Sequence, residues 1–120
     1  MRLSEELRGR TKRFASTVIR FYVNLSHERK EVEVLGRPLL RSGTSVAAHA
    51  REASRARSAV EFCSKPDGLL QEADETELWI ELLREDCGIR GDQMDRLHQE
   101  VNELTGIFTA MVSKLRRRSW

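Results

Sequence analysis

The apolar residues near the C-terminus place the tightest limit on what this chain can fold into. Seven of them alternate at spacings of three and four residues: Met94, Leu97, Val101, Leu104, Phe108, Met111 and Leu115. This spacing puts one apolar stripe on a helix in heptad register, the pattern of left-handed helical bundles. Asp92 is placed to cap the start of such a helix. The pattern therefore predicts a helix over residues 92–117 that contributes a whole face to a bundle core.

Three further segments show helical periodicity, and no segment shows a convincing strand pattern. We expect helices over residues 4–25, 37–56 and 58–87 in addition to the one over 92–117. The connections between them are only a few residues long, which makes neighbouring helices antiparallel. A chain of 120 residues suits one domain. The sequence thus predicts an all-α protein, a single up-down-up-down four-helix bundle over residues 1–120.

Two prolines affect where the middle helices begin. Pro38 suits the first turn of a helix, where a missing N–H costs little, so the second helix is expected to begin just before it, with a helical lead-in from Lys30 as the alternative. Ser58 and Glu61 form a capping box at the start of the third helix. Pro66 interrupts that helix, and we interpret the segment as one kinked helix because its apolar face resumes in phase. The inner face of the second helix is expected to allow close packing, because it carries several small residues: Ser42, Gly43, Ala47, Ala50 and Ala53.

The net charge is only +2, but the charges are unevenly distributed. Residues 1–30 carry eight Lys and Arg against three acids, whereas residues 58–91 carry three against nine. Either these segments neutralise one another within the fold or across a subunit contact, or the basic segments form a surface for RNA or DNA. We favour the first interpretation, because so small a net charge attracts phosphate weakly. The candidate nucleic-acid contacts come from the first helix and the C-terminal tail: Arg8, Arg10, Lys12, Arg13, Lys114, Arg116, Arg117 and Arg118.

The motifs that usually carry chemistry in helical bundles are missing from the sequence. Di-metal bundles use two Glu-x-x-His motifs, and this chain has none. Cys63 and Cys87 lack the Cys-x-x-Cys spacing of zinc sites, and no Gly-x-Ser-x-Gly or glycine-rich phosphate loop occurs. We therefore expect no catalytic residue, no metal, no cofactor and no small-molecule substrate. Without a signal-peptide pattern or an apolar run of ~20 residues, we also expect no membrane association and a cytoplasmic protein with reduced thiols.

The acidic run from Glu72 to Glu77 is most simply explained as a solvated helix face. Glu72 and Glu75, however, lie three residues apart on the side of the helix near the core. They are positioned to pair with Arg41 or Arg51 on the second helix. Partly buried ion pairs of this kind mainly fix the register between elements and add little stability.

The second and third helices also carry a family pattern. Its segments are Arg41-Ser-Gly-Thr-Ser-Val-Ala-Ala, Arg51-Glu-Ala-Ser-Arg-Ala-Arg-Ser58, Glu61-Phe62 and Gln71-Glu-Ala-Asp-Glu-Thr-Glu-Leu-Trp79. The pattern resembles the four helix bundle protein family, which is similar to the proteins encoded in intervening sequences of bacterial 23S ribosomal RNA genes. The matching polar positions are Arg41, Ser45, Glu52, Glu72 and Glu75. The chain departs from the family pattern at His49-Ala50, where Asn-Tyr is usual, and at Pro38 and Pro66.

The resemblance implies a bundle without enzyme activity that associates as a ring, most often a pentamer. A related branch of accessory proteins, from diversity-generating retroelements, binds nucleic acid and a reverse transcriptase. Surplus apolar residues on the first and third helices also favour self-association, because one helical stripe cannot hold them all. We expect Tyr22, Trp79 and Leu82 at or near the subunit contacts. The leading hypothesis is a homo-oligomeric scaffold, and the alternative is a nucleic-acid-binding accessory protein.

Overall fold

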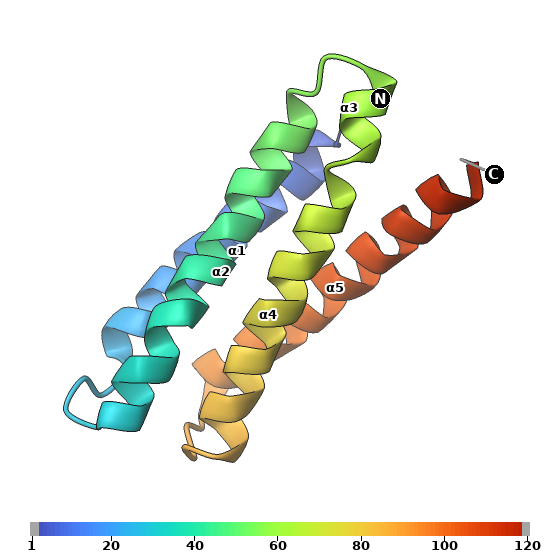
Figure 1. Ribbon diagram of the computed structural model, residues 1–120. Helices are drawn as coiled ribbons and strands as arrows, with labels where there is room; N and C mark the ends of the chain where they lie inside the picture. The colour runs from blue at the N-terminus through green and yellow to red at the C-terminus, as the bar shows by residue number, and fades with distance from the viewer. Residues whose placement is uncertain (1–2, 119–120) are drawn as a thin grey trace.

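The computed structural model describes residues 3–118 and shows an all-helical single domain, as predicted (Figure 1). Four long helices run alternately up and down, and a fifth, short helix precedes the third long one. The bundle measures 48 × 23 × 22 Å, and both ends of the described chain lie at the same end of it. The helices are α1 (Glu5–Asn24), α2 (Lys30–Ser54), α3 (Ala59–Cys63), α4 (Pro66–Glu85) and α5 (Asp92–Arg118).

Consecutive long helices are neighbours in the bundle. α1 packs on α2, α2 on α4 and α4 on α5, while the contact that closes the bundle between α1 and α5 is less extensive. Two serines cap helix starts as expected. The hydroxyl of Ser4 accepts from the N–H of Leu7, and that of Ser58 accepts from the N–H of Glu61, each at 3.1 Å. Side-chain capping therefore sets the starts of α1 and α3.

α2 begins at Lys30, so the expected start at residue 37 is wrong and the lead-in is part of the helix. Pro38 accordingly lies inside α2 instead of in its first turn. Val32 and Gly36 are buried, which gives the segment before the proline an apolar face that packs on the core. The carbonyl that loses its partner at the proline belongs to Val34, an exposed residue, so this carbonyl lies on the solvent side of the helix.

Pro66 separates two helices, so the prediction of one kinked helix over residues 58–87 is also wrong. It stands at the first position of α4, where its missing N–H costs little. Ser64 and Lys65, between the two helices, keep right-handed helical backbone angles. The chain therefore continues in nearly the same direction, which explains why the apolar face resumes in phase after the proline.

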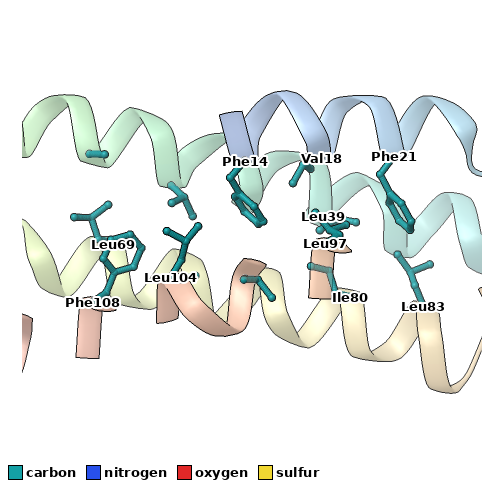
Figure 2. Packing of buried hydrophobic residues seen from close by; sticks show 14 of the residues in the cluster. Phe14, Val18, Phe21, Leu39, Leu69, Ile80, Leu83, Leu97, Leu104 and Phe108 are labelled. Carbon is teal, nitrogen blue, oxygen red and sulfur yellow. The ribbon is translucent and has the colours of Figure 1, made fainter. Parts of the chain in front are cut away.

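The core runs along the whole bundle axis and is lined from all four long helices. Figure 2 shows Phe14, Val18, Leu69, Leu97 and Phe108 pointing into the space between the ribbons. The predicted stripe of α5 is buried over its first five positions, which are Met94, Leu97, Val101, Leu104 and Phe108.

The stripe of α5 is less deeply buried near its end. Met111 and Leu115 are only half-buried, and Val112 is buried in their place. An α-helix with 3.6 residues per turn drifts by ~20° per heptad relative to a strict seven-residue repeat. Over the three heptads from Met94 to Leu115 this drift amounts to ~60°, so Met111 and Leu115 lie at the edge of the core and pack against it without being fully buried.

Candidate interaction surfaces

A polar seam crosses the core between α2 and α4. The hydroxyl oxygens of Ser42 and Thr76 lie 2.8 Å apart, and both residues are fully buried. Thr76 Oγ1 also lies 2.7 Å from the carbonyl oxygen of Glu72, and Ser42 Oγ lies 3.3 Å from that of Leu39. Each buried hydroxyl is therefore hydrogen-bonded. The hydrogen bond between Ser42 and Thr76 favours this register of α2 against α4, because a shift of either helix would break it, although each hydroxyl would keep the carbonyl of its own helix.

Arg41 extends this seam to the surface. Its Nη2 lies 2.8 Å from Glu75 Oε2 and its Nη1 lies 3.4 Å from Glu72 Oε2, which confirms the predicted pairing for Arg41 but not for Arg51. Glu72 is 8% exposed, whereas the side chain of Arg41 is 60% exposed. An ion pair this open to water stabilises the fold by less than about 1 kcal/mol, so its main effect is on register.

The other two family-motif positions lie elsewhere and do not join this seam. Glu52 forms an ion pair with Lys65 at 3.8 Å. The backbone carbonyl oxygen of Ser45 lies 2.9 Å from Nδ1 of His49. The ring of His49 covers Gly68, where a Cβ would lie only 2.7 Å from the ring. The five motif residues are thus spread along the α2–α4 contact and form no single site.

The outer face of α2 and α4 carries an apolar patch, defined here as Val34, Leu78, Trp79 and Leu82. Val34 is 53% exposed and Leu78 is 47% exposed, while Trp79 and Leu82 are half-buried. The antiparallel pairing of Ser42 with Thr76 places Val34 and Leu82 toward one end of the bundle, whereas Leu78 and Trp79 lie within one turn of Thr76, near its middle. The Nε1–H of Trp79 is buried and has no acceptor among the described residues. The apolar patch therefore includes an unsatisfied hydrogen-bond donor.

Tyr22, the third expected contact residue, lies in a polar cluster at the α1–α2 connection. Its hydroxyl donates to Oε1 of Glu33 at 3.3 Å, and its ring meets the edge of the His27 ring with centroids 4.9 Å apart. Glu33 also binds His27 and, at 3.0 Å, Nε of Arg37. The hydrogen bond to Glu33 raises the pKa of His27, and the bonds from His27 and Arg37 lower the pKa of Glu33. Tyr22 thus has partners within its own chain.

The basic residues singled out in the sequence differ in what they bind. Arg10 donates to both carboxylate oxygens of Glu100 at 2.9 and 2.7 Å and to Glu103 at 2.9 Å, so its guanidinium joins α1 to α5. Arg8 pairs with Glu5 at 3.5 Å, and Arg116 pairs with Asp67 at 3.3 Å. Four others form no ion pair within the described residues: Lys12, Arg13, Lys114 and Arg117. The side chain of Arg118 lies outside the described part of the structure.

Two open grooves flank α1 and are lined by cations. The groove between α1 and α2 encloses about 420 Å³ and is lined by Arg8, Lys12, Ala47, Ala48, Arg51, Glu52 and Arg55. The groove between α1 and α5 encloses about 540 Å³, and its charged lining is Arg13, Arg20, Arg96, Asp92 and Glu100. Arg51 and Arg55 were not predicted as surface contacts. The signal for them is their spacing of four residues, which places both on the side of α2 next to α1.

These features define an all-α bundle in which several polar side chains, such as Arg10, Arg41 and Ser42, join one helix to another. In the part of the chain that the structure describes, no three His, Cys, Asp or Glu side chains gather in a way that could hold a metal ion. None of the described helices is long and apolar enough to cross a membrane. The chain belongs to the 23S rRNA-intervening sequence protein family, which it matches over residues 6–110.

A solved structure shares this fold. It is the crystal structure of a protein of unknown function from the S23 ribosomal protein family of Bacteroides thetaiotaomicron. The two chains are 30% identical, and the match covers 88% of this chain and 96% of that one with a TM-score of 0.77. No curated protein matches the chain. The family resemblance and the four-helix-bundle prediction are therefore confirmed.

Proposed function

We propose that the protein is a non-catalytic cytoplasmic scaffold that assembles with copies of itself, with a ring of five subunits as the expected form. The observation that carries the proposal is the apolar patch on α2 and α4. Soluble monomers rarely expose large contiguous apolar surfaces, and such a patch with a polar rim is typical of protein–protein contacts. A second copy of the chain is the occupant that the family resemblance favours.

The half-buried ring of Trp79 supports a contact at this place. The Nε1–H is buried within the bundle itself, so an acceptor on a neighbouring subunit reaches it only if the ring moves. Tryptophan is also enriched among the residues that contribute most to protein–protein binding. Trp79 and Leu82 are therefore retained as contact residues in the proposal, while the internal hydrogen bond of Tyr22 gives it a smaller part.

The charges on α4 and α1 favour a contact between two different surfaces of the chain. Glu77 and Glu81 directly precede Leu78 and Leu82 along α4, and burial together with Glu81 and Asp74 raises the pKa of Glu77. Arg13 and Arg20 on α1 offer unlike charge beside the α1–α5 groove. A contact between two different surfaces of the same chain is head-to-tail, and head-to-tail contacts close into rings when the rotation permits. The number five follows from the family resemblance alone.

Static light scattering on purified protein tests the assembly. The chain has a mass of 13.9 kDa, so a five-membered ring has a mass of about 70 kDa. Leu78→Glu places a charge in the apolar patch and should shift the protein to monomer. Val60→Glu is the matched control, because Val60 is 84% exposed on α3 at the opposite end of the bundle.

The results separate two failures. A parent protein that scatters as a monomer would end the assembly proposal. An oligomer that persists unchanged in Leu78→Glu would keep assembly and remove the apolar patch from its contact. Loss of assembly in Val60→Glu alone would move the contact to α3.

A further inference from the structure

Four cations converge on the groove between α1 and α2, and we call them the basic groove: Arg8, Lys12, Arg51 and Arg55. A second hollow of about 460 Å³ adjoins it, and the same four side chains line it together with Glu5 and Gly9. The floor is made of small residues, Gly9, Ala47 and Ala48. The four long cationic side chains therefore line an open groove whose other lining residues are mostly small.

The geometry of two antiparallel helices produces this arrangement. Arg8 and Lys12 lie four residues apart on one face of α1, while Arg51 lies in the last turn of α2 and Arg55 is the residue that follows its end at Ser54. Like charges at this spacing destabilise an isolated helix by ~0.2–0.5 kcal/mol per pair. The arrangement therefore has a cost to folding, which a bound anion would offset.

Neighbouring acids neutralise the basic groove only in part. Glu5 pairs with Arg8 at 3.5 Å, and Glu52 is directed to Lys65 at 3.8 Å. Lys12, Arg51 and Arg55 form no ion pair within residues 3–117. An excess of positive charge therefore remains at the groove although the whole chain is near neutrality.

A purely structural role accounts for half of the cluster. Cations in the last turn of a helix interact favourably with its dipole, which explains Arg51 and Arg55 near the end of α2. The same argument disfavours Arg8, which lies in the first turn of α1 near its positive end, and it does not explain Lys12, which lies beyond that turn. The groove between α1 and α5 is a weaker candidate for anions, because Asp92 and Glu100 lie within it.

We propose that the basic groove binds the phosphate backbone of a nucleic acid. Guanidinium and ammonium groups donate charge-assisted hydrogen bonds to phosphate oxygens, and releasing the counterions of the nucleic acid drives the association. The residues that line the groove include no aromatic ring for base stacking and no Asn or Gln for adenine edges, so we expect contacts to the phosphates to supply most of the affinity. The basic groove includes none of the cations of the C-terminal tail that the sequence suggested as nucleic-acid contacts.

Fluorescence anisotropy with a short labelled single-stranded RNA and a short labelled DNA duplex tests the proposal across a salt series. Arg51→Gln with Arg55→Gln should weaken binding ~10-fold at low salt. It should also reduce the slope of log affinity against log salt by about 1.8 for duplex DNA or about 1.4 for single-stranded RNA, as expected for two lost phosphate contacts. The RNA and DNA arms show which nucleic acid the groove prefers.

The matched control is Lys30→Gln with Arg90→Gln, which removes the same charge from exposed positions at the other end of the bundle. Equal weakening in both double variants would overturn the proposal, because it would show a general charge effect. Absence of binding to either nucleic acid near 50 mM salt would overturn it as well. Competition by polyglutamate as strong as by unlabelled nucleic acid would assign the groove to acidic proteins instead.

A second variant guards against misfolding. Arg8→Gln with Lys12→Gln changes the α1 half of the groove and should weaken binding to a similar extent, with a helical circular-dichroism signal like that of the parent. Full binding in this folded variant would overturn the proposal. Because light scattering reports assembly separately, failure of the groove and failure of the scaffold proposal remain distinguishable.

Discussion

At the scale of single residues, Gly43 controls how closely the first two helices approach. A Cβ at this position would lie 2.8 Å from Cγ2 of Val18, which is closer than real side chains come. Gly36 repeats the arrangement about two turns earlier on the same face of α2, with Leu25 and Tyr22 at 3.1 and 3.2 Å from a Cβ. The close approach expected from the small residues of α2 is therefore found at its contact with α1.

Gly43→Ala should destabilise the protein by about 1–3 kcal/mol, since the new methyl group overpacks a buried contact. Gly106→Ala is the control on α5, because nothing lies within 4 Å of a Cβ there. This control should stabilise the protein by about 0.5–1 kcal/mol through helix propensity alone. Urea unfolding followed by circular dichroism measures both, and equal stability of the two variants would contradict the packing argument.

Glu77 gives a pH-dependent prediction at the same scale. Its pKa is raised by burial and by Glu81 and Asp74, so the folded chain binds this proton more readily than the unfolded chain does. Ionisation of Glu77 therefore opposes folding above the raised pKa, and the penalty disappears as the pH falls below the ordinary value of 4.5. Glu77→Gln should raise the melting temperature at neutral pH and have little effect near about pH 4. Glu85→Gln, an exposed change on the same helix, corrects for net charge.

At the scale of elements, the α1–α2 connection is fixed by side chains. Leu25 ends α1 with its N–H bonded to the Tyr22 carbonyl at 3.1 Å, and Nε2 of His27 lies 3.1 Å from the same oxygen. The other ring nitrogen of His27 contacts Glu33 on the first turns of α2. One histidine therefore joins the end of one helix to the start of the next.

Stability should depend on pH through this connection. The pKa of His27 is raised, so its stabilising effect is complete below 6.5 and is lost as the pH rises through the raised value. The parent should be more stable than His27→Gln at about pH 6, and the difference should shrink by about pH 9. Urea unfolding across this range checks the direction. A difference that grew with pH would show that the charged histidine does not stabilise the turn.

At the scale of the whole molecule, α1 and α5 close the bundle with the least contact among its neighbouring pairs. Arg10 strengthens that closure through its three hydrogen bonds to Glu100 and Glu103. The apolar patch lies on α2 and α4, away from the contact between α1 and α5. A subunit contact at the patch would therefore add to the α2–α4 half of the bundle, where the packing is already extensive.

Assembly predicts that the melting temperature rises with protein concentration, because the associated form stabilises the folded chain by mass action. Trp79→Ala should reduce or abolish this dependence, since it removes an aromatic side chain from the proposed contact. Differential scanning calorimetry over a wide range of concentration measures the effect. A melting temperature of the parent that is constant with concentration would contradict coupled assembly.

The sequence by itself determined the features that depend on neighbours along the chain. Heptad spacing predicted the burial of Leu97 through Phe108, because periodicity alone decides which side of a helix is apolar. Ser4 and Ser58 predicted two helix starts, because a cap needs only the next three residues. Pairing of Glu72 and Glu75 with Arg41 or Arg51 was predicted from the helix face that the two acids share, and the structure selects Arg41.

Only the tertiary structure decided what depends on how the helices are rotated and shifted against one another. It placed Pro38 inside α2, since packing of Val32 and Gly36 stabilises the helix before it. It paired Arg10 with Glu100, 90 residues away, and so removed one predicted contact from the open surface. It also gathered the four cations of the basic groove from two helices whose sequences show only separate pairs. Such contacts join residues far apart in the chain, and local periodicity holds no information on their relative rotation.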